Sequence, residues 1–227
     1  MGKVLYMRKG ETHAAPLTGV SLADIAEGSI VKLNENGSPV EFYVAKHDYE
    51  SALNGAGRTL LVRKDCYDTR AWGATGTTTY ADNTLDTWFN ETYLALLDAD
   101  AQEIIGTTQF YYTPSPSDND VTILNRAVFA LSLTEMGQSA RNANAEGSAL
   151  PIASALQIAY LDGTATTQWT RTCSNSTFTN RAKLFYLDAT GAVASIQPIY
   201  AQGSRPCFTI PSTALFDEDT LEFKEVA

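Results

Sequence analysis

Cysteine and histidine are scarce in this chain of 227 residues, which holds three cysteines and two histidines. Cys66, Cys173 and Cys207 form no CxxC pair, and His13 and His47 lie far apart in the sequence. The local ligand spacing of a zinc site is therefore missing, and so is a local Cys–His catalytic dyad. We expect no metal site and no cofactor, and we expect Cys66 to be unpaired.

Positive charge and long apolar runs are also in short supply. The chain has 16 Lys and Arg against 26 Asp and Glu, a net charge of −10. Because such a chain has no excess of cations to neutralise phosphates, we exclude nucleic acid as a main partner and expect no membrane insertion. The apolar run within Met1–Lys9 is too short for a signal peptide, and no run reaches the ~20 residues that cross a bilayer. We expect a protein made in the cytoplasm without a signal peptide.

The residues that are abundant point to a strand-rich fold. Charged residues make up 19% of the chain, while Thr, Ser, Asn and Tyr are plentiful, a balance typical of β-rich extracellular and virion proteins. No linker or repeat divides the sequence. The simplest prediction is an α+β fold with a small β-rich N-terminal addition. We assign residues 1–50 to an N-terminal β-hairpin region and residues 51–227 to the main domain, together forming one compact unit.

Turn signals and apolar patterns place the first strands. Ile30–Leu33 and Val40–Val44 flank a polar stretch whose Asn36-Gly37 step suits a hairpin turn. Arg58–Lys64 is apolar at its centre, which favours a central strand. Further strands are predicted at 107–113, 121–131, 184–187, 193–196 and 206–210. The segment 150–161 is apolar, but its period is ambiguous.

Helical periodicity appears in the middle of the chain. Leu85, Trp88 and Phe89 stand at i, i+3 and i+4 behind a possible cap at Asp82, which predicts a core-facing helix over 82–97. A second short helix is predicted from Asp98 to Ile105. We expect Trp88 and the other two tryptophans to be mostly buried structural residues.

Four segments carry a family resemblance: Tyr80–Asn90, Val128–Leu133, Gln168–Cys173 and Gly203–Phe208. They resemble an uncharacterised domain family of gut bacteria and their phages, whose members carry WWLRSP and GVRPAL at the last two positions. The first ten residues and 211–221 resemble its phage-associated branch, so the resemblance covers nearly the whole chain. It implies a C-type-lectin-like fold, related to sulfatase-modifying enzymes and to variable receptor-binding proteins of some phages.

The resemblance also implies roles for the motif residues. The aromatic members supply core area, and arginines embedded in apolar strands need internal partners, so we take as structural Trp88, Trp169, Arg171, Arg205 and Pro206. Cys173 and Cys207 replace a proline and an alanine of the family pattern. We expect them on neighbouring strands, at a distance that permits a disulfide if the compartment is oxidising. The calcium-dependent sugar-binding motifs of lectin relatives are missing from the sequence.

In lectin-like folds the segment between the last two motifs forms the exposed ligand face. Here this segment mixes rigid aromatic rings with adaptable amides and hydroxyls, a combination favoured in binding surfaces. In the alternative interpretation its aromatic residues fill the core of this lobe. In related phage proteins a retroelement diversifies this stretch. The predicted ligand-binding residues are Asn175, Ser176, Phe178, Asn180, Tyr186, Tyr200 and Gln202.

These observations favour a non-enzymatic, virion-associated binding protein of a phage, such as a tail fibre, receptor-binding protein or head fibre. Its expected partners are other virion proteins and a host surface glycan or protein, with homo-oligomers formed inside an assembly. The main alternative is a capsid or tail decoration protein without a host ligand. A bacterial surface adhesin and a formylglycine-generating-like enzyme have less support, because the export signal and the acid, base or ligand cluster they require are missing from the sequence.

Overall fold

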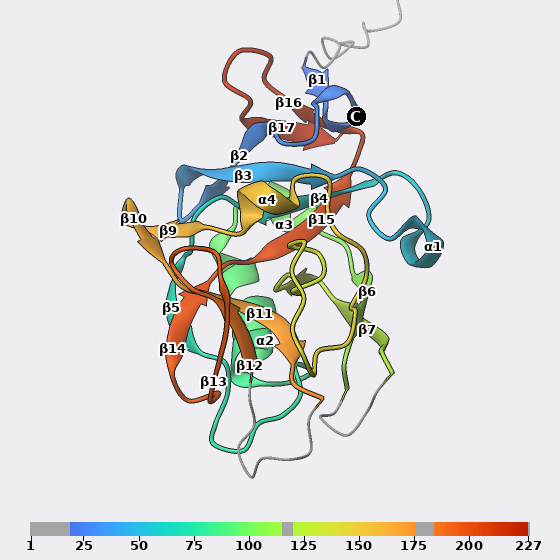
Figure 1. The fold of residues 1–227 in the computed structure, drawn as a ribbon. Coiled ribbons are helices and arrows are strands. Elements are labelled where there is room, and N and C mark those ends of the chain that lie inside the picture. Colours follow the sequence, from blue (N-terminus) through green and yellow to red (C-terminus); the bar gives the residue numbers. More distant parts are fainter. Residues whose placement is uncertain (1–18, 115–119, 176–183, 227) are drawn as a thin grey trace, which may run out of the picture.

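Two five-stranded sheets organise the computed structural model, which describes residues 19–114, 120–175 and 184–226 (Figure 1). The architecture is α+β and strand-rich, with short helices. The first sheet is antiparallel throughout, and its central strand β4 is buried from Thr59 to Val62 as its apolar sequence predicts. In spatial order it contains β2 (Ile30–Glu35), β3 (Ser38–Lys46), β4 (Arg58–Arg63), β15 (Cys207–Pro211) and β8 (Val128–Phe129).

The predicted hairpin between β2 and β3 is confirmed. Asn36 and Gly37 have φ values of 53° and 72°, the left-handed pair of conformations that lets a two-residue turn match the twist of its strands. Glu35 then pairs with Ser38 and Ile30 with Tyr43. Because β3 pairs next with β4, residues before and after position 50 share one sheet.

The second sheet carries the C-terminal motifs of the sequence. Its strands β11 and β14 run parallel, and its other pairs are antiparallel. Figure 1 shows it below the first sheet, joined to it where β14 continues into β15. In spatial order it contains β13 (Val193–Ile196), β12 (Leu184–Leu187), β11 (Gln168–Cys173), β14 (Ala201–Ser204) and β5 (Asp68–Ala71).

Smaller strand groups and short helices complete the described part of the chain. β1 pairs with β16 and β16 with β17, while β6–β7 and β9–β10 form separate two-stranded sheets. The strands are β1 (Val20–Ser21), β6 (Thr108–Tyr112), β7 (Thr122–Arg126), β9 (Ala159–Leu161), β10 (Thr164–Thr166), β16 (Ala214–Phe216) and β17 (Phe223–Val226). The helices are η1 (Leu22–Asp24), α1 (Ser51–Asn54), α2 (Thr84–Trp88), η2 (Phe89–Tyr93), η3 (Leu94–Leu96), α3 (Ala99–Ile104) and α4 (Ala153–Leu156). Each of these described helices is too short to span a bilayer.

The predicted helix over 82–97 is present but irregular. Its cap is Asn83 and not Asp82, because the Asn83 side chain accepts a hydrogen bond from the Asp86 N–H at 2.8 Å, while Asp82 has a φ of 59°. After α2 the turn widens to a π-helix in η2 and tightens to a 3₁₀-helix in η3. The next predicted helix is confirmed as α3, with Asp98 at its N-cap position.

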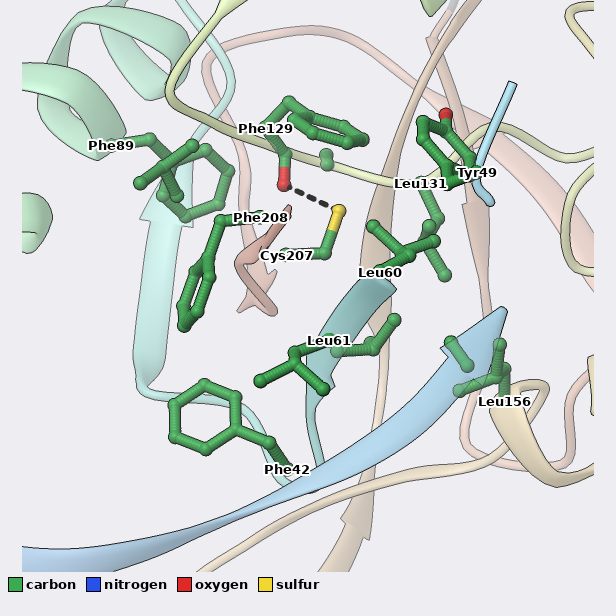
Figure 2. Close-up of a cluster of buried hydrophobic side chains, with 14 of the residues drawn as sticks. Phe42, Tyr49, Leu60, Leu61, Phe89, Phe129, Leu131, Leu156, Cys207 and Phe208 are labelled. Atoms are coloured by element: carbon green, nitrogen blue, oxygen red, sulfur yellow. Dashed lines mark hydrogen bonds between the residues drawn. The ribbon is translucent and has the colours of Figure 1, made fainter. Parts of the chain in front are cut away.

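One hydrophobic core joins both sheets and the helices (Figure 2). Phe42 from β3 and Phe208 from β15 lie with ring centroids 5.3 Å apart, and Phe110 stacks on Phe129 at 4.4 Å. Leu60 points into the same cluster from β4 (Figure 2). Since this cluster takes side chains from both sides of position 50, the N-terminal hairpin and the main domain are packed together.

The tryptophans differ in their burial. Trp72 is fully buried and Trp169 is 2% exposed, and their indole N–H groups donate to the carbonyl oxygens of Thr170 and Arg70. Trp88 is only partly buried, and the Arg70 guanidinium covers its ring at 3.6 Å. The expectation that all three are mostly buried is confirmed, with Trp88 at the border of the core.

Neither Cys173 nor Cys207 forms a disulfide in the structure, and the expectation that they lie on neighbouring strands is wrong. Cys173 lies in β11 of the second sheet and Cys207 in β15 of the first, so they are not on neighbouring strands. The Cys207 thiol donates to the Phe129 carbonyl at 3.0 Å (Figure 2), and the Cys173 thiol to the Thr113 carbonyl at 3.6 Å. Cys66 is a buried free thiol, as expected.

Candidate functional site

A buried ion-pair network fixes the irregular segment between β8 and β11. The Arg171 guanidinium donates to both carboxylate oxygens of Glu135, at 2.6 and 2.9 Å, and lies 3.9 Å from Glu146. All three side chains are fully buried. Tyr49 donates a short hydrogen bond to Glu135, and Glu146 accepts from the Thr113 N–H at 2.7 Å. Burial raises the pKa of Glu146, although Arg171 acts in the opposite direction. The network ties loops to sheets and has no exposed side chain.

Arg205 is the second buried arginine, and it binds neutral acceptors. It donates to the carbonyl oxygens of Arg63, Lys64 and Leu156 and to the side-chain oxygen of Gln168, at 2.7–3.1 Å. Burial lowers its pKa. The internal partners expected for the two motif arginines are thus present, and Pro206 is buried beside Arg205.

Together, Arg205 and Arg63 hold the loop that links β4 to β5. Arg205 binds the carbonyl oxygens of residues 63 and 64, and Arg63 binds those of Asp65 and Cys66, each at 2.8 Å. Arg63 is itself fixed by both carboxylate oxygens of Glu35, at 3.0 and 3.1 Å. Four consecutive carbonyl groups are therefore bound by guanidinium donors, which makes this loop a rigid element.

A cleft of about 560 Å³ opens over this rigid loop. Its other walls come from β2, β3, the β9–β10 turn and the residue that precedes β17. The Cys66 N–H donates to the Tyr160 carbonyl at 2.8 Å and thereby connects the loop to the β9–β10 hairpin. The cleft is lined by Lys32, Pro39, Val40, Glu41, Arg63, Lys64, Asp65, Cys66, Tyr67, Leu161, Asp162, Gly163 and Glu222.

The cleft combines charges of both signs. Lys64 pairs with Glu41 at 2.6 Å and Lys32 with Glu222 at 3.7 Å, and these four side chains are partly exposed. Asp65 and Asp162 have no ion pair or side-chain hydrogen bond within the described ranges of the chain. Two unpaired carboxylates therefore face a cleft whose cations are already engaged.

The cysteine in the cleft is not tuned for nucleophilic chemistry. Burial raises the pKa of the Cys66 thiol to about 11, and burial also raises that of Cys207 well above its ordinary value. Both thiols are protonated at neutral pH, and the thiol is a far weaker nucleophile than the thiolate. Among the residues with described structure, no group of three or more His, Cys, Asp or Glu is placed to hold a metal ion.

The predicted ligand-binding residues do not form one exposed set. Tyr200 is 51% exposed, whereas Gln202 is buried in β14. Tyr186 is half-buried and packs edge-on against Trp169, and the Asn175 amide donates to the Asn144 side chain at 2.7 Å. Of the predicted set, Ser176, Phe178 and Asn180 lie outside the described residues.

Sequence reasoning missed the cleft for a physical reason. Its residues come from five separate parts of the chain, which strand pairing and loop contacts bring together. The one local signal is the run Arg63-Lys64-Asp65, three consecutive charged residues that begin at the end of the buried strand β4. The position of Arg63 and Arg205 around the loop could not be inferred from that run.

These features define a strand-rich α+β domain with a rigid, polar cleft. Residues 56–212 match the family described as a domain of unknown function, DUF6273, and the chain belongs to this family. No curated protein and no solved structure matches the chain. The matched range begins just before β4, so Lys32, Glu41 and Glu222 of the cleft lie outside it.

Proposed function

We propose that this chain is a non-enzymatic binding protein of a phage particle and that its cleft takes a polyhydroxylated ligand, such as a host-surface glycan. The observation that carries the proposal is the rigid loop 63–66. It presents the unpaired carboxylate of Asp65 in a cleft that also contains the unpaired carboxylate of Asp162. Binding sites gain affinity when their polar groups are held in place before the ligand arrives. The carbonyl-to-arginine contacts hold this loop without any ligand.

The chemistry of the lining favours hydroxyl groups over anions. An ionised carboxylate accepts hydrogen bonds at both oxygens, so Asp65 and Asp162 can each receive the paired hydroxyls of a sugar ring. A phosphate or sulfate would meet these carboxylates, while Lys32 and Lys64 are already paired with acids. The protonated thiol of Cys66 fits a binding role more closely than a catalytic one.

The phage setting and the C-type-lectin-like fold are parts of the same proposal. They are supported by the motif resemblance, the polar and strand-favouring composition, and the strand-rich α+β architecture with long irregular segments. A tail fibre or a head fibre made in the host cytoplasm and carried in the virion fits these features. Fold alone does not give function, so the test addresses the cleft.

The test is glycan binding by the purified full chain, measured on a glycan array and then by calorimetry with the glycans retained. We expect Asp65→Asn and Asp162→Asn each to weaken binding by about tenfold or more, on the order of one lost charge-assisted hydrogen bond. Asp24→Asn, at an exposed acid outside the cleft, is the matched control and should bind like the parent. Absence of glycan binding, or equal binding by all variants, would contradict the proposal.

A decoration protein of the capsid or tail is the second candidate, favoured by β13, an end strand of its sheet that carries neither charge nor proline. Adsorption to whole host cells and to empty capsids separates the two. Cell adsorption that falls with Asp65→Asn supports the receptor-binding function. Binding to capsids alone, unchanged by that substitution, supports decoration.

A further inference from the structure

The outer edge of β13 has unpaired backbone groups. The Asp188 N–H donates to the Ala192 carbonyl at 2.9 Å, in the register that pairs Leu187 with Val193. Hydrogen-bonded and non-hydrogen-bonded pairs alternate along antiparallel strands. The N–H and C=O groups of Val193 and Ser195 therefore point away from β12, and no hydrogen bond engages them within the described residues.

Within the part of the chain that the structure describes, this edge also lacks the usual protection against pairing. Strand edges are normally blocked by charged side chains, proline, bulges or a covering segment. The sequence of β13 is Val-Ala-Ser-Ile, without charge or proline, and its register with β12 is regular. The strand is the end strand of its sheet.

Exposed apolar side chains flank both ends of β13. Among the described residues, five large apolar side chains are exposed: Ile123, Ile158, Tyr160, Ile199 and Tyr200. Ile158 lies beside Gly191 at the start of β13, since a Cβ on that glycine would be 3.4 Å from Ile158 Cγ1. Ile199 and Tyr200, 45% and 51% exposed, follow the end of the strand.

We propose that β13 pairs with β13 of a second copy of this chain, about a twofold axis through Ala194. In this antiparallel arrangement Val193 of each copy faces Ser195 of the other, and each such pair exchanges two backbone hydrogen bonds. The twofold axis also brings Ile158 of one copy to the Ile199–Tyr200 end of the other. The surface is thus its own complement in hydrogen bonding and in apolar contact.

Another sheet edge, that of β7, is a poorer candidate. The Asn54 side chain binds the backbone N–H and C=O of Gln109, so these two groups point away from β7. Gln109 pairs with Asn125, and the backbone groups of Asn125 therefore point to the outer side of β7. There the Arg126 guanidinium donates to the Asn125 carbonyl at 2.8 Å. One outward carbonyl of this edge is therefore already engaged, although the Arg126 charge itself is paired with Asp82 and Asp86.

Sedimentation equilibrium of the full chain tests the proposal. The parent should dimerise, and Ser195→Pro, which removes an outward N–H, should raise the dimer dissociation constant at least about tenfold. Asn125→Pro removes the matching N–H on β7 and should leave the dimer unchanged. Ser195→Lys and Asn125→Lys repeat the comparison without altering the backbone, and circular dichroism verifies that each variant folds.

Each other outcome overturns the proposal. A parent that stays monomeric at the highest concentration measured has no β13 interface. Loss of the dimer with the Asn125 variants alone assigns the interface to β7, and a dimer that survives all four substitutions lies elsewhere. Glycan binding by the same variants is scored separately, because the cleft does not include β13.

Discussion

At the scale of single residues, the most consequential side chain is Arg171. Its place in an apolar strand predicts a structural role. In the structure Arg171 donates two hydrogen bonds to Glu135 and lies near a second acid, Glu146. The sequence does not identify those partners. Glu135 and Glu146 lie in a loop-rich stretch that reads as polar surface, yet both are fully buried.

Arg171→Leu should therefore lower the free energy of unfolding by about 3–5 kcal/mol, because it leaves the buried Glu135 carboxylate without its cation. Lys32→Met removes an ion pair that is partly exposed and should cost less than about 1 kcal/mol. Urea denaturation measures both. The double variant Arg171→Leu with Glu135→Leu should recover part of the loss, and equal stability of the parent and Arg171→Leu would show that the network contributes little.

Within the elements, the contact between β14 and β11 is unusually close at Gly203. A Cβ there would lie 2.3 Å from the Thr167 carbonyl oxygen and 2.5 Å from the Cys66 sulfur. Gly203→Ala must therefore move a backbone, and we expect a loss of about 1–3 kcal/mol in unfolding free energy.

The matched control for that substitution is Gly106→Ala. The nearest atoms to its Cβ would be the end of the Arg58 side chain, with Nη2 at 2.8 Å. A side chain that donates to Thr209 and Ile104 must then shift, which costs less than moving backbone. Thermal melts of the two variants provide the comparison. A melting temperature for Gly203→Ala equal to that of Gly106→Ala would mean that β14 moves freely against β11.

Elements with local signals were predictable, and those set by distant contacts were not. The Asn36-Gly37 turn and the apolar centre of β4 are encoded within a few residues, so the hairpin and the central strand were found correctly. The π turn at Phe89–Tyr93 and the cap at Asn83 depend on packing, and the periodicity of 82–97 could not show them. The predicted placement of Cys173 and Cys207 on neighbouring strands is wrong because sequence motifs do not specify which sheet each strand joins.

At the scale of the whole molecule, the family domain depends on its flanks. β3 pairs with β4, and Glu35 holds Arg63 beneath the cleft. A protein consisting of residues 56–212 should therefore lose cooperative unfolding, because one side of β4 and part of the core are uncovered. Cooperative unfolding of 56–212 near the parent temperature would show that the flanks are dispensable.

The edges of β13 and β7 also bear on how copies of this chain could grow into larger assemblies. When β13 of one copy pairs with β13 of another about a twofold axis, both edges are used and the assembly stops at two copies. Pairing of β13 on one copy with β7 on the next would leave an unused edge at each end, and such head-to-tail contacts build open filaments. The Arg126 contact with the Asn125 carbonyl disfavours that second route. If β13 pairs with itself as proposed, one side-chain contact on β7 therefore favours a closed dimer over a filament of no fixed length.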